Sequence, residues 1–295
     1  MTSILTNVSA MAALQTLRSI NTDLQGAQNR VSTGYRISEA KDNSAYWSIA
    51  TTMRSDNSAV QAASDALGVG AAKVDVAYAG VKSAIDIVTE IKSKLVSASE
   101  TSVDVGKIQD EISQLQAQLK SIASSASFNG ENWLLASTTT STSTVVTGFV
   151  RTGPGSVLVA TETVTIGEFA LFGNNNGQAD ATKGVLKDVA TIALVESAST
   201  ATMVNDALQV VEKALSELTK GAATLGSLSA RIDLQTEFAQ SLSDSIETGI
   251  SRLVDADMEA ESAKLTALQT QQQLAIQPLS IANSNAQNIL TLFRQ

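Results

Sequence analysis

The strongest candidates for chemistry in this sequence are four acidic residues, Asp255, Asp257, Glu259 and Glu261. Clustered carboxylates can bind Ca²⁺ or Mg²⁺, which take several oxygen ligands. In a helix, however, the i,i+4 pairs 255/259 and 257/261 fall on different faces, and no EF-hand spacing is present. We therefore favour a simpler interpretation, acidic side chains in the first turn of a helix, where the helix dipole stabilises negative charge. We expect no metal and no cofactor.

The composition excludes several classes of function. The chain has no His and no Cys, which removes imidazole and thiol catalysis, disulfides and zinc ligation by these residues. Its formal net charge of -9 is unsuited to displacing counterions from nucleic acid. No window is long and apolar enough to span a bilayer, and the N-terminal residues lack the charged and apolar regions of a cleaved signal peptide. We expect no enzyme, no nucleic-acid binding and no membrane insertion.

A second group of candidate residues, basic and aromatic, lies between positions 30 and 54. The basic side chains could pair with the acidic cluster, within or between subunits, or they could face solvent, and both alternatives stay open. The adjacent aromatic pair could form a ligand-binding surface, but anchors of an inter-subunit contact are the favoured interpretation. The candidates for inter-subunit contact are Arg30, Arg36, Lys41, Tyr46, Trp47, Arg54, Asp255 and Asp257.

Helices at the two chain ends must position these residues, and their apolar residues recur in alternating steps of three and four. This spacing places every member on one stripe of a helix, the stripe that packs against a partner helix. The first helix is expected over residues 3–32, with Ser3 as its N-cap and Gly34 behind its end. The C-terminal stripe has one polar member, Gln272. The stripe residues expected to drive association are Leu17, Ile20, Leu24, Val31, Leu265, Leu268, Leu279, Ile289 and Phe293.

Two longer helices carry the same spacing, over residues 43–98 and 202–253. Both greatly exceed the average helix of about 11–12 residues, as is typical of coiled coils and long bundles. In the second, a step of three from Leu225 to Leu228 predicts a stammer, a local overwinding of the helix. A shorter helix is expected between them, with its apolar face over residues 108–122.

The middle of the chain changes to a β-type composition. Residues 137–144 are an unbroken run of Ser and Thr, which we interpret as an unmodified linker, with O-linked sugars as the alternative. The segments after it are rich in β-branched residues, and Pro154-Gly155 between two of them indicates a hairpin. We predict strands at Val145–Arg151, Ser156–Val159 and Thr163–Ile166 and a loop tip at 174–177.

The expected fold is mainly α: a long antiparallel helical coiled-coil bundle formed by the N- and C-terminal parts, with a small β-rich inserted module. The terminal helices would comprise residues 1–42 and 255–295. The long-helix bundle would comprise residues 43–136 and 190–254, and residues 137–189 would form a variable, surface-exposed module.

Several stretches resemble the terminal signatures of bacterial flagellins. SILTN at the start and RVSTGYRISEAKDNSAYWSIATTMRSD from Arg30 are similar to the N-terminal signature, with AYWSIATTMRSDN closest to the rhizobial kind. FNG from Phe128 is similar to the turn after the third helix. SRLVDADMEAESAKL from Ser251 and QQQLAIQPLSIANSNAQNILTLF from Gln271 resemble the C-terminal signature. The resemblance covers roughly the first 135 and the last 95 residues.

This resemblance implies a subunit that polymerises into the extracellular filament of the bacterial flagellum and serves swimming motility. Its partners would be copies of itself, sister flagellins, the flagellar export apparatus with an export chaperone, the filament cap and the hook-associated junction proteins. The terminal helices would line the filament core and drive assembly. They bury little apolar area against an ordering cost of about 1–2 kcal/mol per residue, so we expect them to be disordered in the monomer.

Two features depart from the family pattern. Some flagellins activate a vertebrate innate receptor through a helical surface where this chain has Glu90 and Lys94 in place of Arg and Leu, so weak or absent activation of reporter cells is expected. Pro278 stands where Ala is usual, in a stripe that continues past it. We predict a kinked but uninterrupted helix that alters filament shape relative to a Pro278→Ala filament.

Two other classes are less well supported. A hook–filament junction protein would share the terminal design, and a secreted coiled-coil translocator would carry an apolar membrane-inserting segment.

Overall fold

The computed structural model describes residues 7–100, 103–136, 141–153, 156–194 and 200–292. These residues form five α-helices and two small sheets, which confirms the mainly α fold with a β-containing insertion. The chain divides into two compact units, residues 1–57 with 244–295 (the terminal unit) and residues 58–243 (the central unit). Helices α2 (Ser44–Ser97) and α4 (Thr200–Val254) contribute to both.

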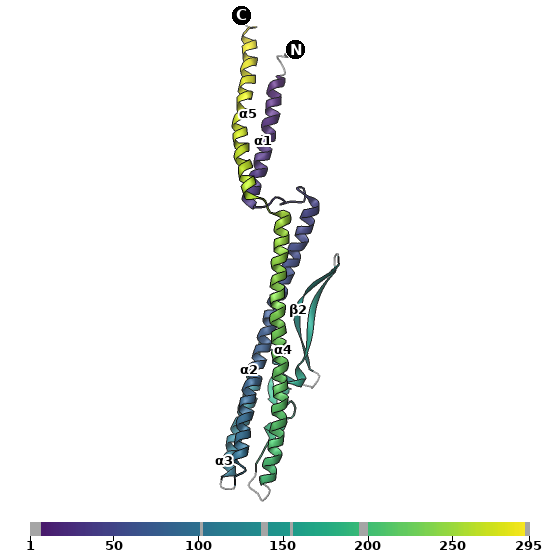
Figure 1. Ribbon diagram of the computed structural model, residues 1–295, viewed down its shortest axis with the longest axis vertical. Helices are drawn as coiled ribbons and strands as arrows, with labels where there is room; N and C mark the ends of the chain where they lie inside the picture. The colour runs from purple at the N-terminus through teal and green to yellow at the C-terminus, as the bar shows by residue number, and fades with distance from the viewer. Residues whose placement is uncertain (1–6, 101–102, 137–140, 154–155, 195–199, 293–295) are drawn as a thin grey trace. The chain divides into compact units, whose positions relative to one another are not determined.

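The terminal unit contains two helices that run antiparallel, α1 (Val8–Thr33) and α5 (Met258–Leu292), with both chain ends at the same end of the pair (Figure 1). Asn7 caps α1, because its Oδ1 accepts the N–H of Ala10 at 3.1 Å. The predicted N-cap Ser3 lies outside the described residues. Helix α1 ends before Gly34, whose φ of 74° suits a left-handed C-cap and whose N–H donates to the Arg30 carbonyl at 2.9 Å.

The two connectors of this unit are joined by backbone hydrogen bonds. The carbonyl of Val254 accepts the N–H groups of Arg36 at 2.7 Å and Ile37 at 3.3 Å, and Ala256 donates to the Gly34 carbonyl at 2.8 Å. Pairing of this kind fixes the chain where α1 leads into α2 and α4 leads into α5. A small apolar core covers it, made by Ile37, Ala50 and Val254 with Trp47 and Leu253 packed against them.

The core of the central unit lies among α2, α4 and the shorter helix α3 (Val105–Ser125). The apolar residues that recur along α2 in alternating steps of three and four form the α2 stripe, and all of them are buried: Val60, Ala63, Leu67, Gly70, Val74, Ala77, Val81, Ala84, Val88, Ile91 and Leu95. Leu67, Val81 and Leu95 have no exposed surface. The predicted stripe of α3 is likewise buried at Ile108, Ile112 and Leu119. Full burial of such side chains stabilises by about 1.5–3 kcal/mol each, so these stripes carry the stability of the unit.

The predicted stammer in α4 is wrong. The buried positions continue in alternating steps of three and four through Leu225, Leu228 and Ile232 without a change of phase. The large residues Leu208 and Leu215 also fit the apolar spacing and are expected on the stripe from the sequence, but they are only partly buried beside it. Small residues occupy the stripe instead: Ala207, Ala214 and Gly221. At Gly221, Phe169 approaches the helix closely.

Two strands form a long hairpin beside the helices, β2 (Thr142–Gly153) and β3 (Ser156–Thr165) (Figure 1). The expected separate strand at Thr163–Ile166 is wrong, because β3 runs unbroken to Thr165. Strand β2 also begins at Thr142, inside the run 137–144 that we took for a linker; residues 137–140 lie outside the described part. Thr has a high propensity for β-strands, so the polar composition of this run was not sufficient to predict a loop.

A second sheet orders the rest of the insertion, with β1 (Leu135–Ala136) parallel to β4 (Phe172–Asn175) and β4 antiparallel to β5 (Gln178–Asp180). The sequence had predicted only the tip at 174–177. One-turn 3-10 helices lie at Ile166–Glu168 and Val189–Thr191. This segment joins the main core rather than standing apart from it, through Phe169, Leu171, Phe172, Leu186 and Val189.

Gly221 allows a close contact that no other residue would permit. A Cβ built there would lie 2.7 Å from Cβ of Phe169, whereas nothing lies within 4 Å of the corresponding point at Gly226. We predict that Gly221→Ala destabilises the central unit by about 1–3 kcal/mol through overpacking. Gly226→Ala, its matched control on the same helix, should stabilise by about 0.5–1 kcal/mol. Urea unfolding followed by circular dichroism measures both, and equal effects would contradict the role of this contact.

Candidate functional site

The apolar stripe between α1 and α5 is only partly buried. The side chains of Ala10, Ala27 and Leu268 are buried, but most other members keep part of their surface in solvent. The contrast with the α2 stripe, where side chains are fully buried, is large. The side chain of Ile289 and the residue Phe293 lie outside the described part of the chain. The predicted association residues that are half-buried are Leu17, Ile20, Leu24, Val31, Leu265 and Leu279.

Two polar contacts fix the register of α1 against α5. Gln272, the polar member of the stripe, donates from Nε2 to Oδ1 of Asn21 at 2.7 Å. Near the chain ends, Asn7 donates from Nδ2 to the carbonyl of Ala282 at 2.9 Å. A polar pair in an apolar stripe specifies register, because any slip would leave both groups half-buried without partners. The sequence had shown Gln272 as an exception but had not identified Asn21.

Large apolar side chains of this helix pair are also exposed outside the stripe. Val8 is 73% exposed and Met11 59% exposed on α1, while Leu274, Ile276 and Ile281 are 56%, 55% and 61% exposed on α5. Single exposed apolar residues are ordinary on a protein surface, but these two adjacent helices expose several large ones.

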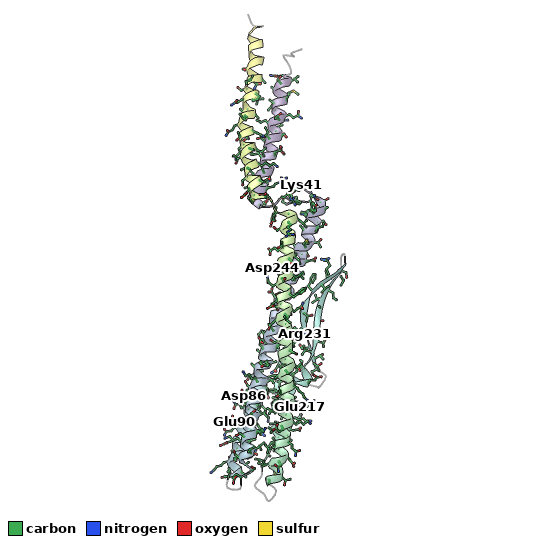
Figure 2. All side chains as sticks on the ribbon, viewed as in Figure 1. Lys41, Asp86, Glu90, Glu217, Arg231 and Asp244 are labelled. Atoms are coloured by element: carbon green, nitrogen blue, oxygen red, sulfur yellow. The ribbon has the colours of Figure 1, made fainter. Side chains whose placement is uncertain are left out.

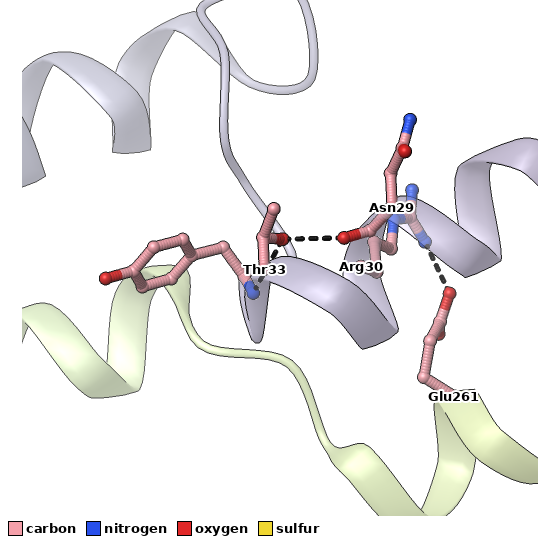
Figure 3. A network of polar contacts seen from close by, with 5 residues as sticks. Asn29, Arg30, Thr33 and Glu261 are labelled. Carbon is pink, nitrogen blue, oxygen red and sulfur yellow. Dashed lines mark hydrogen bonds and ion pairs between the residues drawn. The ribbon is translucent and has the colours of Figure 1, made fainter.

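The acidic cluster begins helix α5. Asp257 accepts the N–H groups of Glu259 at 3.0 Å and Ala260 at 3.2 Å through Oδ1, which makes it the N-cap. This confirms the helix-start interpretation for Asp257, Glu259 and Glu261, whereas Asp255 precedes the helix and forms a β-bridge with Tyr35. Glu261 reaches α1, where its Oε1 lies 3.5 Å from an Nη of Arg30 (Figure 3). At this distance and exposure the pair contributes about 0–1 kcal/mol.

The other predicted basic residues find different partners. Arg36 donates to the carbonyls of Arg252 at 3.5 Å and Leu253 at 2.8 Å, and so neutralises the C-terminal end of α4. Lys41 pairs with Glu39 at 2.7 Å, and this carboxylate raises the pKa of the Lys41 ammonium.

Of the aromatic candidates, Trp47 packs into the small core of the terminal unit, whereas Tyr46 is 44% exposed. The guanidinium of Arg54 lies 5.1 Å from the ring centre of Tyr35, within the range of a cation–π contact. The structure thus gives Trp47 and Arg54 contacts inside the chain and leaves Tyr46 on the surface.

Lys94 bonds across helices rather than along its own. Its Nζ lies 2.6 Å from Oε2 of Glu111 on α3, and this hydrogen bond is the main cause of its raised pKa. Glu90, four residues before Lys94 on the same helix, adds only a smaller electrostatic contribution to that pKa and is exposed.

Pro278 does not end α5, which continues to Leu292. Pro278 and Leu274, whose carbonyl loses its hydrogen bond, both lie on the exposed side of the helix, where water can solvate the carbonyl. The kink itself stays a prediction.

Residues that the sequence analysis missed hold the hairpin on α4. Glu162 on β3 and Arg231 on α4 form a two-point contact, with Nη–Oε distances of 3.1 Å and 2.9 Å, and Arg231 lies on the side of α4 that faces the hairpin (Figure 2). At Gly70 of α2 a Cβ would lie 2.6 Å from Cγ1 of Val145, so glycine there allows the hairpin to approach α2 closely.

Gln116 of α3 holds the segment after β5, since its Nε2 donates to the carbonyls of Val189 and Ile192.

Within the described residues, no helix is long and apolar enough to cross a membrane. The same part of the chain contains no group of three or more His, Cys, Asp or Glu placed to hold a metal ion.

Comparison with known proteins gives the family. The pattern of the bacterial flagellin N-terminal helical region matches residues 4–140, and that of the C-terminal helical region matches residues 208–293. The chain is 49% identical to flagellin of Brucella melitensis over 295 positions and 44% identical to flagellin A of Rhizobium meliloti over 395 positions, with both proteins covered completely in each case. Flagellin of Bacillus cereus, a solved structure, shares 14% identity and a TM-score of 0.41 over 60% of this chain and 88% of that one.

The chain therefore belongs to the bacterial flagellin family. It is a structural protein and not an enzyme.

The contact between Glu162 and Arg231 predicts a measurable titration. The hydrogen bond from Arg231, and then its charge, lower the pKa of the Glu162 carboxyl. A carboxyl with a lowered pKa stabilises the fold above its unfolded pKa of about 4.3, and this contribution is lost as the pH falls through the lowered value. Titration of the Glu162 carboxyl by NMR should give a pKa below about 4.3, and Arg231→Gln should restore it. An unchanged value in Arg231→Gln would contradict this contact.

Proposed function

We propose that the terminal unit is the assembly element of this flagellin and that α1 and α5 are completed by neighbouring subunits in the filament. The family gives the role of the whole chain, a subunit of the extracellular flagellar filament that serves motility. The observation that carries the proposal is the half-closed stripe between α1 and α5 together with the apolar residues exposed outside it. Neighbouring copies would remove both from water, which is the dominant favourable contribution to association.

The different burial of the helix stripes suggests which part of the chain forms the core of the filament and which part forms its shell. Residues 1–42 and 255–295 would form the filament core, and the well-packed helices of the central unit would form the shell around it. The hairpin would lie on the outer side. The fully buried stripes of the central unit support this assignment, because they need no further partner.

The remaining partners are proposals from the family. Export without a cleaved signal, with the export apparatus and a chaperone, and assembly between junction proteins and a cap are consistent with terminal helices that are incomplete alone. Exposed Glu90 and the Lys94–Glu111 pair support the prediction of weak activation of the innate receptor.

Exposed apolar residues of α5 should control polymerisation. Replacing Leu274 and Ile281 together by Ser should weaken the free energy of subunit association by about 3 kcal/mol or more, because two apolar side chains are no longer buried. This raises the critical concentration by a factor on the order of 100. Growth of purified subunits on sheared filament ends measures this. Gln277→Ser is the matched control, an exposed position on the same helix, and should leave the critical concentration unchanged. Equal growth of the double variant and the control would contradict the proposal.

The same helices should be disordered in the free monomer. Because their shared stripe is only half-buried, the burial they achieve alone does not offset the entropy of ordering. Amide hydrogen exchange on monomer should show no protection at Leu17 or Ile289, but strong protection at Val81 and Leu95 in the central unit. Protection of Leu17 or Ile289 at the level of Val81 would show the opposite.

A further inference from the structure

The outer half of the β2–β3 hairpin exposes apolar side chains on both of its faces. Val150 is 48% exposed, Val157 54%, Leu158 58% and Val159 54%. Leu158 pairs across the strands with Val150, and Val159 pairs with Phe149. Since successive side chains of a strand point to opposite faces, Leu158 and Val150 share one face and Val159 lies on the other.

One of these faces is turned toward α4. A Cβ at Gly148 would lie 3.1 Å from Nε2 of Gln235 on α4. Val150 is two positions further along the strand and shares the face of Gly148, so this face of the hairpin is directed toward α4. Along α4, Phe238 comes two turns after Arg231 and therefore continues the side that binds the hairpin. Phe238 is 60% exposed and Leu234, one turn before it, is 66% exposed.

This arrangement is unfavourable for an isolated subunit. A two-stranded hairpin is marginally stable alone, and among the described residues no further strand pairs with β2 or β3, so each keeps an open edge. The only charged residue between positions 142 and 161 is Arg151, so the hairpin lacks the charges that usually protect strand edges. The exposed apolar side chains of the hairpin and of α4 together expose on the order of several hundred Å², divided between the two faces of the hairpin and the helix, and apolar areas of this size are typical of interaction sites.

We propose that a second copy of this chain covers the outer half of the hairpin and the Leu234–Phe238 face in the filament. Closure of the hairpin onto its own α4 could cover Val150 and Leu158 but not Val159, which lies on the opposite face. The exposed apolar area is smaller than the roughly 800 Å² that each partner buries in a stable pairwise complex. It is therefore suited to one of several contacts between subunits in a polymer, and not to a dimer free in solution. This inference rests on the proposed function, because it assumes that subunits polymerise.

Thiol labelling tests the coverage directly, since the chain has no Cys of its own. Leu158→Cys and Val159→Cys place single thiols on the two faces. In the monomer both should react with a maleimide at rates near those of the urea-unfolded chain, and in filaments both should react at least tenfold more slowly. Equal rates in monomer and filament would overturn the proposal. Slow labelling of Leu158→Cys already in the monomer would also overturn it, because the chain's own α4 would then be the cover.

A second measurement separates this surface from the terminal helices. Val157→Thr with Val159→Thr keeps β-branched side chains but makes the face polar, and it should raise the critical concentration at least tenfold with an unchanged thermal unfolding midpoint of the monomer. Val96→Thr is the control, an exposed valine on α2 away from the hairpin. An unchanged critical concentration in the double variant would contradict the hairpin contact. Failure of the unsubstituted chain to polymerise would instead contradict the proposed function.

Discussion

Burial of one apolar stripe along α2 is the constraint on which the rest of the central unit depends. Its members are withdrawn from water over more than ten turns of helix, and α3, α4 and the insertion each contribute side chains to the same core. Glycines set how closely the elements approach. Gly70 admits Val145 of the hairpin and Gly221 admits Phe169, so both parts of the insertion reach the helices where a side chain is missing.

The terminal unit obeys the same spacing rule but with a different outcome. Its stripe pairs α1 with α5 and leaves most members half-buried, although Gln272 and Asn21 still define a single register. Identical periodicity therefore produces a stable core in one unit and an open surface in the other. The difference lies in the number of elements that pack on the stripe, since in the described part of the chain no third helix covers the stripe between α1 and α5.

Periodicity predicted the helices and their stripes well, because a helix that buries one side must repeat its apolar residues at a fixed spacing. It failed in α4, where the large residues Leu208 and Leu215 fit the helical spacing but Ala207 and Ala214 are the buried stripe residues. Residue size was misleading there, because both sets of residues repeat at the same spacing. The partners of polar residues were also beyond prediction. Arg231 with Glu162 and Gln116 with the carbonyl of Val189 join positions far apart in sequence, and only the fold brings them together.

The buried ring of Phe169 divides the insertion into two parts with unequal freedom to change in evolution. Around it, any residue that alters volume disturbs the core shared with α4, so the sequence from Ile166 to Phe172 should tolerate little variation. At the far end of the hairpin, Val157 belongs to no core of its own subunit, and added residues would extend the ribbon without displacing a side chain packed within that subunit. The Rhizobium meliloti relative aligns over 395 positions with this chain of 295 residues, and the end of the hairpin is where that extra length would disturb the shared core least.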